Sequence, residues 1–132
     1  MRKFVKHSLV LAMALTLLTG CRTSTIHNVE ANPYIPTSSS VQMDAVAKTI
    51  IRAGAGLGWQ MKKIKEGEIQ GILLLRDHMA KVRIPYTSKD YSILYEDSSN
   101  LKYDAEAKTI HSNYNGWIQN LNNAIQVQLN ML

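Results

Sequence analysis

The opening segment, Met1–Gly20, has the layout of a secretory signal peptide, so the mature part of this chain is expected to begin at Cys21. A basic head is followed by an apolar run, Ser8–Leu18, and then by the small residues Thr19 and Gly20. The apolar run is about 11 residues long, whereas a helix that spans a bilayer needs about 20. The sequence therefore predicts a cleaved export signal over residues 1–20 rather than a membrane-spanning anchor.

Cys21 is the only cysteine of the chain, and an unpaired thiol in an exported protein requires an explanation. It closes the run Leu18-Thr19-Gly20-Cys21, which resembles the lipobox of bacterial lipoproteins at all four positions. The resemblance implies cleavage between Gly20 and Cys21 and acylation of the Cys21 thiol, with palmitate-type chains holding the protein to a membrane. The next residue is Arg22 and not Asp, which by the sorting pattern of enteric lipoproteins favours the outer membrane, with the domain facing the periplasm.

The charge balance of the exported part argues against nucleic acid as a partner. The formal net charge of +5 falls to +2 when the signal is removed, because the signal holds three basic residues, Arg2, Lys3 and Lys6. A nucleic-acid-binding domain would show a basic footprint. With Cys21 acylated, no disulfide can form within the chain, so the domain must depend on its apolar core.

No catalytic or metal-binding motif stands out. A zinc site needs three or four nitrogen, sulfur or oxygen ligands, and the histidines of the exported chain, His27, His78 and His111, do not pair at helical spacing. The chain has no GxSxG motif and no grouping that suggests a catalytic triad. We therefore expect no catalytic residue, no metal and no cofactor, and we expect His111 to satisfy a backbone group at the start of a helix.

Residues 21–40 read as a flexible tether and residues 41–132 as one folded domain. The tether contains Asn32-Pro33, Ile35-Pro36 and the polar run Thr37–Ser40, without apolar periodicity. A helix is predicted over Val41–Leu57, capped by Ser39 or Ser40. Glycines at its end favour termination over a phosphate-binding loop.

A second helix is predicted from Ser112, with Ser112 or Asn113 as its cap. Its apolar face is formed by Trp117, Ile118, Leu121, Ile125 and Leu129. The opposite face is rich in Asn and Gln but carries no charge, which is unusual for a solvated helix.

Alternating or continuous apolar segments between the helices predict strands. They are Trp59–Lys62, Ile69–Leu75, Ala80–Ile84 and Tyr91–Tyr95, followed by a loop at Asp97–Asn100. Lys102–His111 remains open between a loop and a short hairpin. The expected fold is α+β: a helix, an antiparallel meander of three to four strands and a C-terminal helix, in a two-layer α/β sandwich with both helices on one side of the sheet.

Several segments resemble a family of small uncharacterised outer-membrane lipoproteins of Gram-negative bacteria. They are Ile51–Gly54 with Leu57–Trp59, Tyr95–Leu101, and Ile110–Ile118. Together with the lipobox, the resemblance covers nearly all of the exported chain. It implies a compartment and a shape, but no reaction.

Aromatic residues concentrate in the second half of the chain and offer a candidate interaction surface at Tyr86, Tyr95, His111 and Tyr114. The competing interpretation, packing in the core and sheet, is favoured because Tyr91 and Tyr95 follow strand alternation. A second candidate is a basic sheet face formed by Lys62, Arg76, Lys81 and Arg83, which could meet anionic headgroups or peptidoglycan carboxylates, but ordinary solvation is the favoured interpretation.

The leading functional hypothesis is a lipid-anchored, non-enzymatic envelope protein that binds another envelope component, either a protein or peptidoglycan. The alternative is a carrier that holds a small apolar ligand in a cavity between helices and sheet, and the third hypothesis is a hydrolase. A binding module should show an exposed patch, a carrier an apolar pocket, and an enzyme a cleft with converging titratable groups.

Overall fold

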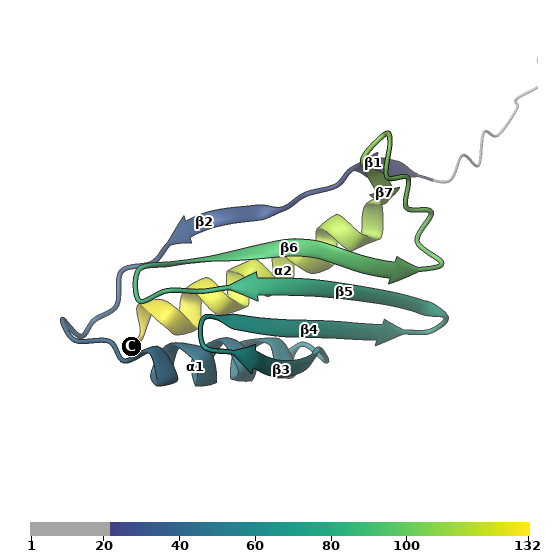
Figure 1. The fold of residues 1–132 in the computed structure, drawn as a ribbon. Helices are drawn as coiled ribbons and strands as arrows, with labels where there is room; N and C mark the ends of the chain where they lie inside the picture. Colours follow the sequence, from purple (N-terminus) through teal and green to yellow (C-terminus); the bar gives the residue numbers. More distant parts are fainter. Residues whose placement is uncertain (1–21) are drawn as a thin grey trace, which may run out of the picture.

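The computed structural model describes residues 22–132, so the predicted signal peptide, its predicted cleavage site at Gly20 and the predicted lipidation site Cys21 lie outside it. Seven strands and two helices follow one another along these residues (Figure 1). In chain order they are β1 (Thr23–Thr25), β2 (Val29–Pro33), α1 (Met43–Gly56), β3 (Gln60–Lys65), β4 (Glu68–Leu75), β5 (His78–Pro85), β6 (Asp90–Ser99), β7 (Thr109–His111) and α2 (Ser112–Asn130).

The predicted meander is present as strands β3 to β6, each antiparallel to the next. Its turns follow the sequence signals, since Gly67 between β3 and β4 takes a positive φ of 81°, which glycine adopts without steric cost. In β4 the residues Ile69, Gly71 and Leu73 are buried while their neighbours are at least partly exposed. This alternation gives the sheet one core face and one wet face.

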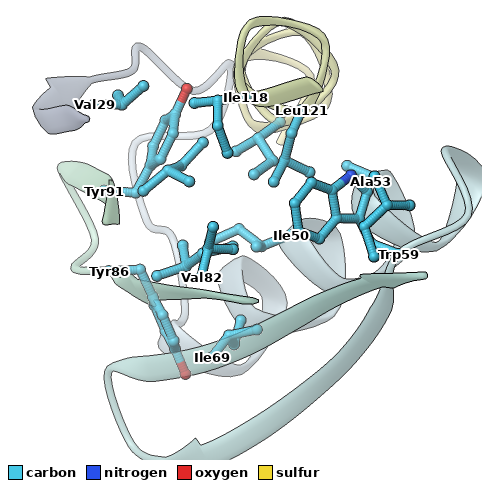
Figure 2. Close-up of a cluster of buried hydrophobic side chains, with 14 of the residues drawn as sticks. Val29, Ile50, Ala53, Trp59, Ile69, Val82, Tyr86, Tyr91, Ile118 and Leu121 are labelled. Carbon is cyan, nitrogen blue, oxygen red and sulfur yellow. The ribbon is translucent and has the colours of Figure 1, made fainter. Parts of the chain in front are cut away.

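Both helices pack on the core face of the sheet (Figure 1). From α1, the buried apolar side chains are Val46, Ala47, Ile50 and Ala53; from α2 they are Tyr114, Ile118, Leu121, Ile125 and Leu129. These side chains meet those of β4, β5 and β6 in one core (Figure 2). The α+β class with two helices and an antiparallel sheet is thus confirmed. The strand count differs, because the main sheet has five strands in the order β2-β6-β5-β4-β3 and β1 pairs with β7 in a separate two-stranded sheet.

Two of the extra strands, β1 and β2, come from the segment predicted to be a tether, and for residues 22–34 that prediction is wrong. Strand β1 pairs with β7, and β2 extends the main sheet by pairing with β6. Val29 is buried in the core and Tyr34 is buried beside it. Short strands with a bulge and a proline give no periodic signal, and their stability comes from tertiary partners that are distant in sequence.

Both helices begin close to the predicted positions, but different residues lie at their N-termini. Helix α1 begins at Met43 after Gln42, without a side-chain cap, and Ser38 Oγ instead accepts a hydrogen bond from the Ser40 amide. At α2, His111 Nδ1 accepts a hydrogen bond from the Asn113 amide at 3.1 Å. The predicted serine and asparagine caps are therefore wrong, whereas the expected role of His111 is confirmed.

Three further findings concern the second half of the chain. Residues 97–99 continue β6 instead of forming a loop, because β5 is long enough to pair with them as far as Ser99. Lys102–His111 resolves into a hairpin, in which Asp104 bridges Thr109, the first residue of β7. Trp117, expected in the apolar stripe of α2, is only partly buried, and Tyr114 lies in that stripe one turn earlier.

The packing of α2 predicts which substitutions the domain tolerates. Ile118→Ala should lower the free energy of unfolding by about 2–5 kcal/mol, because the side chain is fully buried against the sheet. Asn120→Ala, on the exposed side of the same helix, should change it by less than about 0.5 kcal/mol. Chemical denaturation measures both, and equal effects would contradict the orientation of α2.

Candidate functional site

The four predicted interaction residues do not form one surface. Tyr86 and Tyr114 are buried, with hydroxyl groups that have no hydrogen-bond partner among the described residues. Burial also raises the pKa of the Tyr114 phenol. In Figure 2, Tyr86 points away from the helix toward which Tyr91 is directed. The prediction of a contact surface is therefore wrong for Tyr86 and Tyr114. Both rings are enclosed in the core, as the packing interpretation expects.

Tyr95 and His111 remain partly exposed, and each has a structural contact. The Tyr95 ring stacks on Tyr103 with centroids 4.2 Å apart and meets the edge of Tyr114 at 5.7 Å. His111 caps α2, and its ring lies 6.4 Å from that of His78. These rings stabilise the end of the domain where β7 joins α2.

The basic sheet face is only partly realised. Lys62 and Arg83 both lie opposite Gln70 across the sheet. Arg83 Nε, however, lies 3.4 Å from a Glu68 carboxylate oxygen, and Lys81 pairs in register with Asp97. Acidic neighbours therefore offset two of the four cations, which is the pattern of an ordinary solvated sheet.

The uncharged face of α2 is the feature that organises the N-terminal segment. Four amide side chains, spaced so that they fall on one side of the helix, hydrogen-bond to residues 22–37; they are Asn115, Asn122, Gln126 and Asn130. We call this row the amide clasp. An amide both donates and accepts, so it can satisfy backbone groups without bringing a charge into the contact.

At each end of the amide clasp, an asparagine side chain forms hydrogen bonds with backbone groups of the N-terminal segment. Asn115 Oδ1 accepts from the His27 amide at 2.9 Å, and its Nδ2 donates to the Thr25 carbonyl at 2.8 Å. At the other end, Asn130 Oδ1 accepts from the Ile35 amide at 3.0 Å. The segment before α1 is thus fixed along nearly the whole length of α2.

The middle of the clasp is a polar cluster around Tyr91. The Tyr91 hydroxyl donates toward Asn122 Oδ1 and Gln126 Oε1, and Asn32 Nδ2 donates to the same two oxygens at 3.1 and 2.9 Å. Gln126 Nε2 in turn donates to the Pro33 carbonyl at 3.1 Å. Burial of the phenol raises the pKa of Tyr91 to about 12, because the ionised form would lose its solvation.

Beside the clasp runs an open groove of about 570 Å³, between the connection from β1 to β2 and helix α2. We call it the neutral groove, because none of its lining residues is Asp, Glu, Lys or Arg. It is lined by Thr25, His27, Asn115, Gly116, Gln119, Asn122 and Asn123. Gly116, Gln119 and Asn123 follow one another along α2 at helical spacing, so their positions form a second row next to the clasp.

A different groove separates the two helices. It has a volume of about 470 Å³ and is lined mainly by small or apolar residues, with Ala53 and Leu57 from α1 and Ala124 and Val127 from α2. Leu57 is 44% exposed and Val127 58% exposed, so this is an open surface feature. The space between helices and sheet, where a carrier would hold its ligand, is filled by packed side chains (Figure 2).

Within residues 22–132, no group of three or more His, Cys, Asp or Glu side chains could hold a metal ion. None of the described helices is long and apolar enough to cross a membrane. Comparison of the chain with family models, with curated proteins and with solved structures found no match.

Sequence reasoning missed both the clasp and the groove, although one signal pointed to them. From Thr109 to Leu132 the chain contains no Asp, Glu, Lys or Arg, while charged residues make up 19% of the whole. A helix with one face exposed to water usually carries charged residues on that face. The absence of charge indicates that this face is used for hydrogen bonding to something other than water.

The raised pKa of Tyr91 predicts a loss of stability in alkali. An unfolded chain ionises its tyrosines near pH 10, whereas folded Tyr91 stays neutral up to about pH 12. Its contribution is therefore complete below pH 10 and is lost as pH rises toward 12, by roughly 1–3 kcal/mol. Tyr91→Phe should cost about 1–3 kcal/mol at neutral pH by leaving Asn32 and its neighbours unpaired, and this cost should shrink above pH 10. Denaturation curves of both proteins across this range test it; a constant difference would contradict the burial of the phenol.

Gly116 predicts a stabilising substitution. It lies inside α2, and a Cβ added there would meet nothing within 4 Å. Glycine in a helix is less favourable than alanine by roughly 0.5–1 kcal/mol, so Gly116→Ala should raise the free energy of unfolding by about that amount. A loss of stability in denaturant titrations would show that the space over Gly116 is filled.

Proposed function

We propose that this protein is a lipid-anchored lipoprotein of the bacterial outer membrane, facing the periplasm, whose small α+β domain binds another component of the cell envelope without catalysing a reaction. The observation that carries the proposal is the run Leu18-Thr19-Gly20-Cys21, placed directly after an export signal and holding the only cysteine of the chain. Acylation accounts for that thiol, and removal of the signal accounts for the apolar run.

The arrangement of the domain supports a binding role. The histidines at its ordered elements have structural contacts, since His111 Nδ1 caps α2 and the His78 Nδ1 lies 2.8 Å from the Asn100 carbonyl. The neutral groove offers four amide side chains, the Thr25 hydroxyl and the imidazole of His27. Such a surface can recognise a ligand by hydrogen bonding, and no carboxylate or thiol lines the groove beside the imidazole to complete a set of catalytic groups.

The start of the fold bears on how an anchored domain would sit. The Ser112 amide donates to the Arg22 carbonyl at 2.9 Å, so the residue that directly follows Cys21 is already bonded to the start of α2. A lipid on Cys21 would therefore hold the β1–β7 end of the domain at the membrane surface, with no flexible spacer between them. The peptide bond and one residue span only a few ångströms.

The alternative function, transport of a small apolar ligand, has one observation in its favour, the apolar groove between α1 and α2. A carrier would bind a fluorescent fatty acid there, and Ala53→Gln with Ala124→Gln would abolish the signal. Under the proposed function the wild-type protein gives no saturable signal with this probe.

Mass spectrometry of the protein purified from membranes tests the anchor. The N-terminal peptide should begin at Cys21 and carry the mass of the added acyl chains. Cys21→Ser should leave unprocessed precursor or release the protein from the membrane fraction, while Ser24→Ala, three residues further on, should be processed normally. A mature chain with an unmodified Cys21, or cleaved at another position, would overturn the proposal.

A further inference from the structure

The neutral groove has chemistry that the proposed anchor does not explain. Its floor is a helix without a single charged side chain, and its opposite wall presents Thr25 and His27. The side chains of Gln119 and Asn123 are exposed and make no hydrogen bond to another described residue, in contrast to the side chain of Asn115 beside them. These two amides and the Thr25 hydroxyl are free to pair with a ligand.

The walls of the groove are held in place before any ligand arrives. Asn115 fixes the backbone at Thr25 and His27 onto α2. Asn122, which also lines the groove, accepts with its oxygen in the polar cluster around Tyr91, and its Nδ2 group has no hydrogen-bond partner among the described residues. A preorganised site loses less conformational entropy on binding than a mobile one.

Gly116 adds a second, independent observation. A glycine inside an exposed helical turn reduces stability, and no neighbouring atom requires it, since an added Cβ would meet nothing within 4 Å. The missing side chain does keep the groove open, because Gly116 lies in its floor between Asn115 and Gln119. Glycine at position 116 therefore keeps the groove open at the expense of helix stability.

We propose that the neutral groove binds the N-acetylated glycan strand of peptidoglycan. A sugar ring with hydroxyl and acetamido groups offers donors and acceptors but no charge, which matches a lining of four amides, one hydroxyl and one imidazole. Phosphorylated envelope sugars would require cations, and the groove has no lysine or arginine. The volume of about 570 Å³ lies within the usual range of small-ligand sites. The choice of peptidoglycan as the source of the glycan rests on the proposed envelope location; the preference for an uncharged glycan rests on the groove alone.

The first test titrates the full mature protein, purified in detergent, with N,N′,N″-triacetylchitotriose, an uncharged oligomer of N-acetylglucosamine. Side-chain amide resonances of Gln119 and Asn123 in NMR spectra should shift in a saturable way, while those of Asn120, outside the groove, should not. No saturable shift would overturn the proposal. The readout does not depend on whether Cys21 is acylated, so failure of the lipid anchor and failure of glycan binding are distinguishable.

Two variants locate the site. Gln119→Glu keeps the shape of the side chain but places a negative charge in the groove, and Gly116→Gln fills the space above the floor; each should weaken binding by at least about tenfold. Asn120→Asp introduces a similar charge on the same helix, outside the groove, and should leave the affinity unchanged. Equal weakening by Gln119→Glu and Asn120→Asp would show that the helix responds only to net charge and would overturn the assignment.

The biological source is decided by cosedimentation with purified sacculi and, separately, with lipopolysaccharide vesicles. Retention on sacculi, lost in Gly116→Gln and competed by the oligosaccharide, supports the proposal. Retention on lipopolysaccharide alone overturns it. Dimerisation of the wild-type protein in sedimentation velocity that Gln119→Glu abolishes, without an oligosaccharide effect, would identify a second copy of this chain as the occupant and would also overturn it.

Discussion

The amide clasp is the contact on which the remainder of the architecture depends. Residues 22–37 contribute few apolar side chains to the core, with Val29 and Tyr34 as the buried exceptions. Such a segment stays ordered only if its backbone groups find partners, because their desolvation would otherwise oppose folding. The amides of α2 provide some of those partners along one side of the helix, and pairing with β6 and β7 provides others. The helix therefore serves two layers at once, packing apolar residues against the sheet and holding an extended strand along its polar side.

The contrast between locally encoded elements and the N-terminal segment, which depends on distant partners, explains which parts of the structure could be predicted. The meander and both helices follow from local periodicity, which the chain itself encodes over short stretches. Strands β1 and β2 could not be predicted, because they are stabilised by partners that lie far along the sequence, as Thr23 opposite His111 shows. The error at Trp117 has a similar origin, since helical spacing defines a face but not which edge of that face the sheet covers.

The candidate site was harder to predict from the sequence than the fold. Aromatic residues suggested an interaction surface because they are common at interfaces, yet Tyr86 and Tyr114 are buried in the core. The neutral groove is assembled from short polar residues, none of which carries a motif. The only sequence signal for the groove is the long stretch without charged residues that ends at Leu132. Such a signal does not identify a ligand. The structure adds what composition cannot, namely which amides are occupied by the backbone and which, such as Gln119 and Asn123, are free.

Hydrogen–deuterium exchange of the mature protein, followed by mass spectrometry of the peptide covering residues 22–34, tests most directly whether the N-terminal segment is part of the fold. The account predicts that amides with backbone partners, such as Ile26 and Tyr34, exchange slowly, with protection approaching that of α2. It also predicts that Asn115→Ala lowers protection at His27, whose amide donates to that side chain. Exchange of the whole peptide at the rate of an unstructured chain would contradict it and would restore a flexible tether between the anchor and the domain.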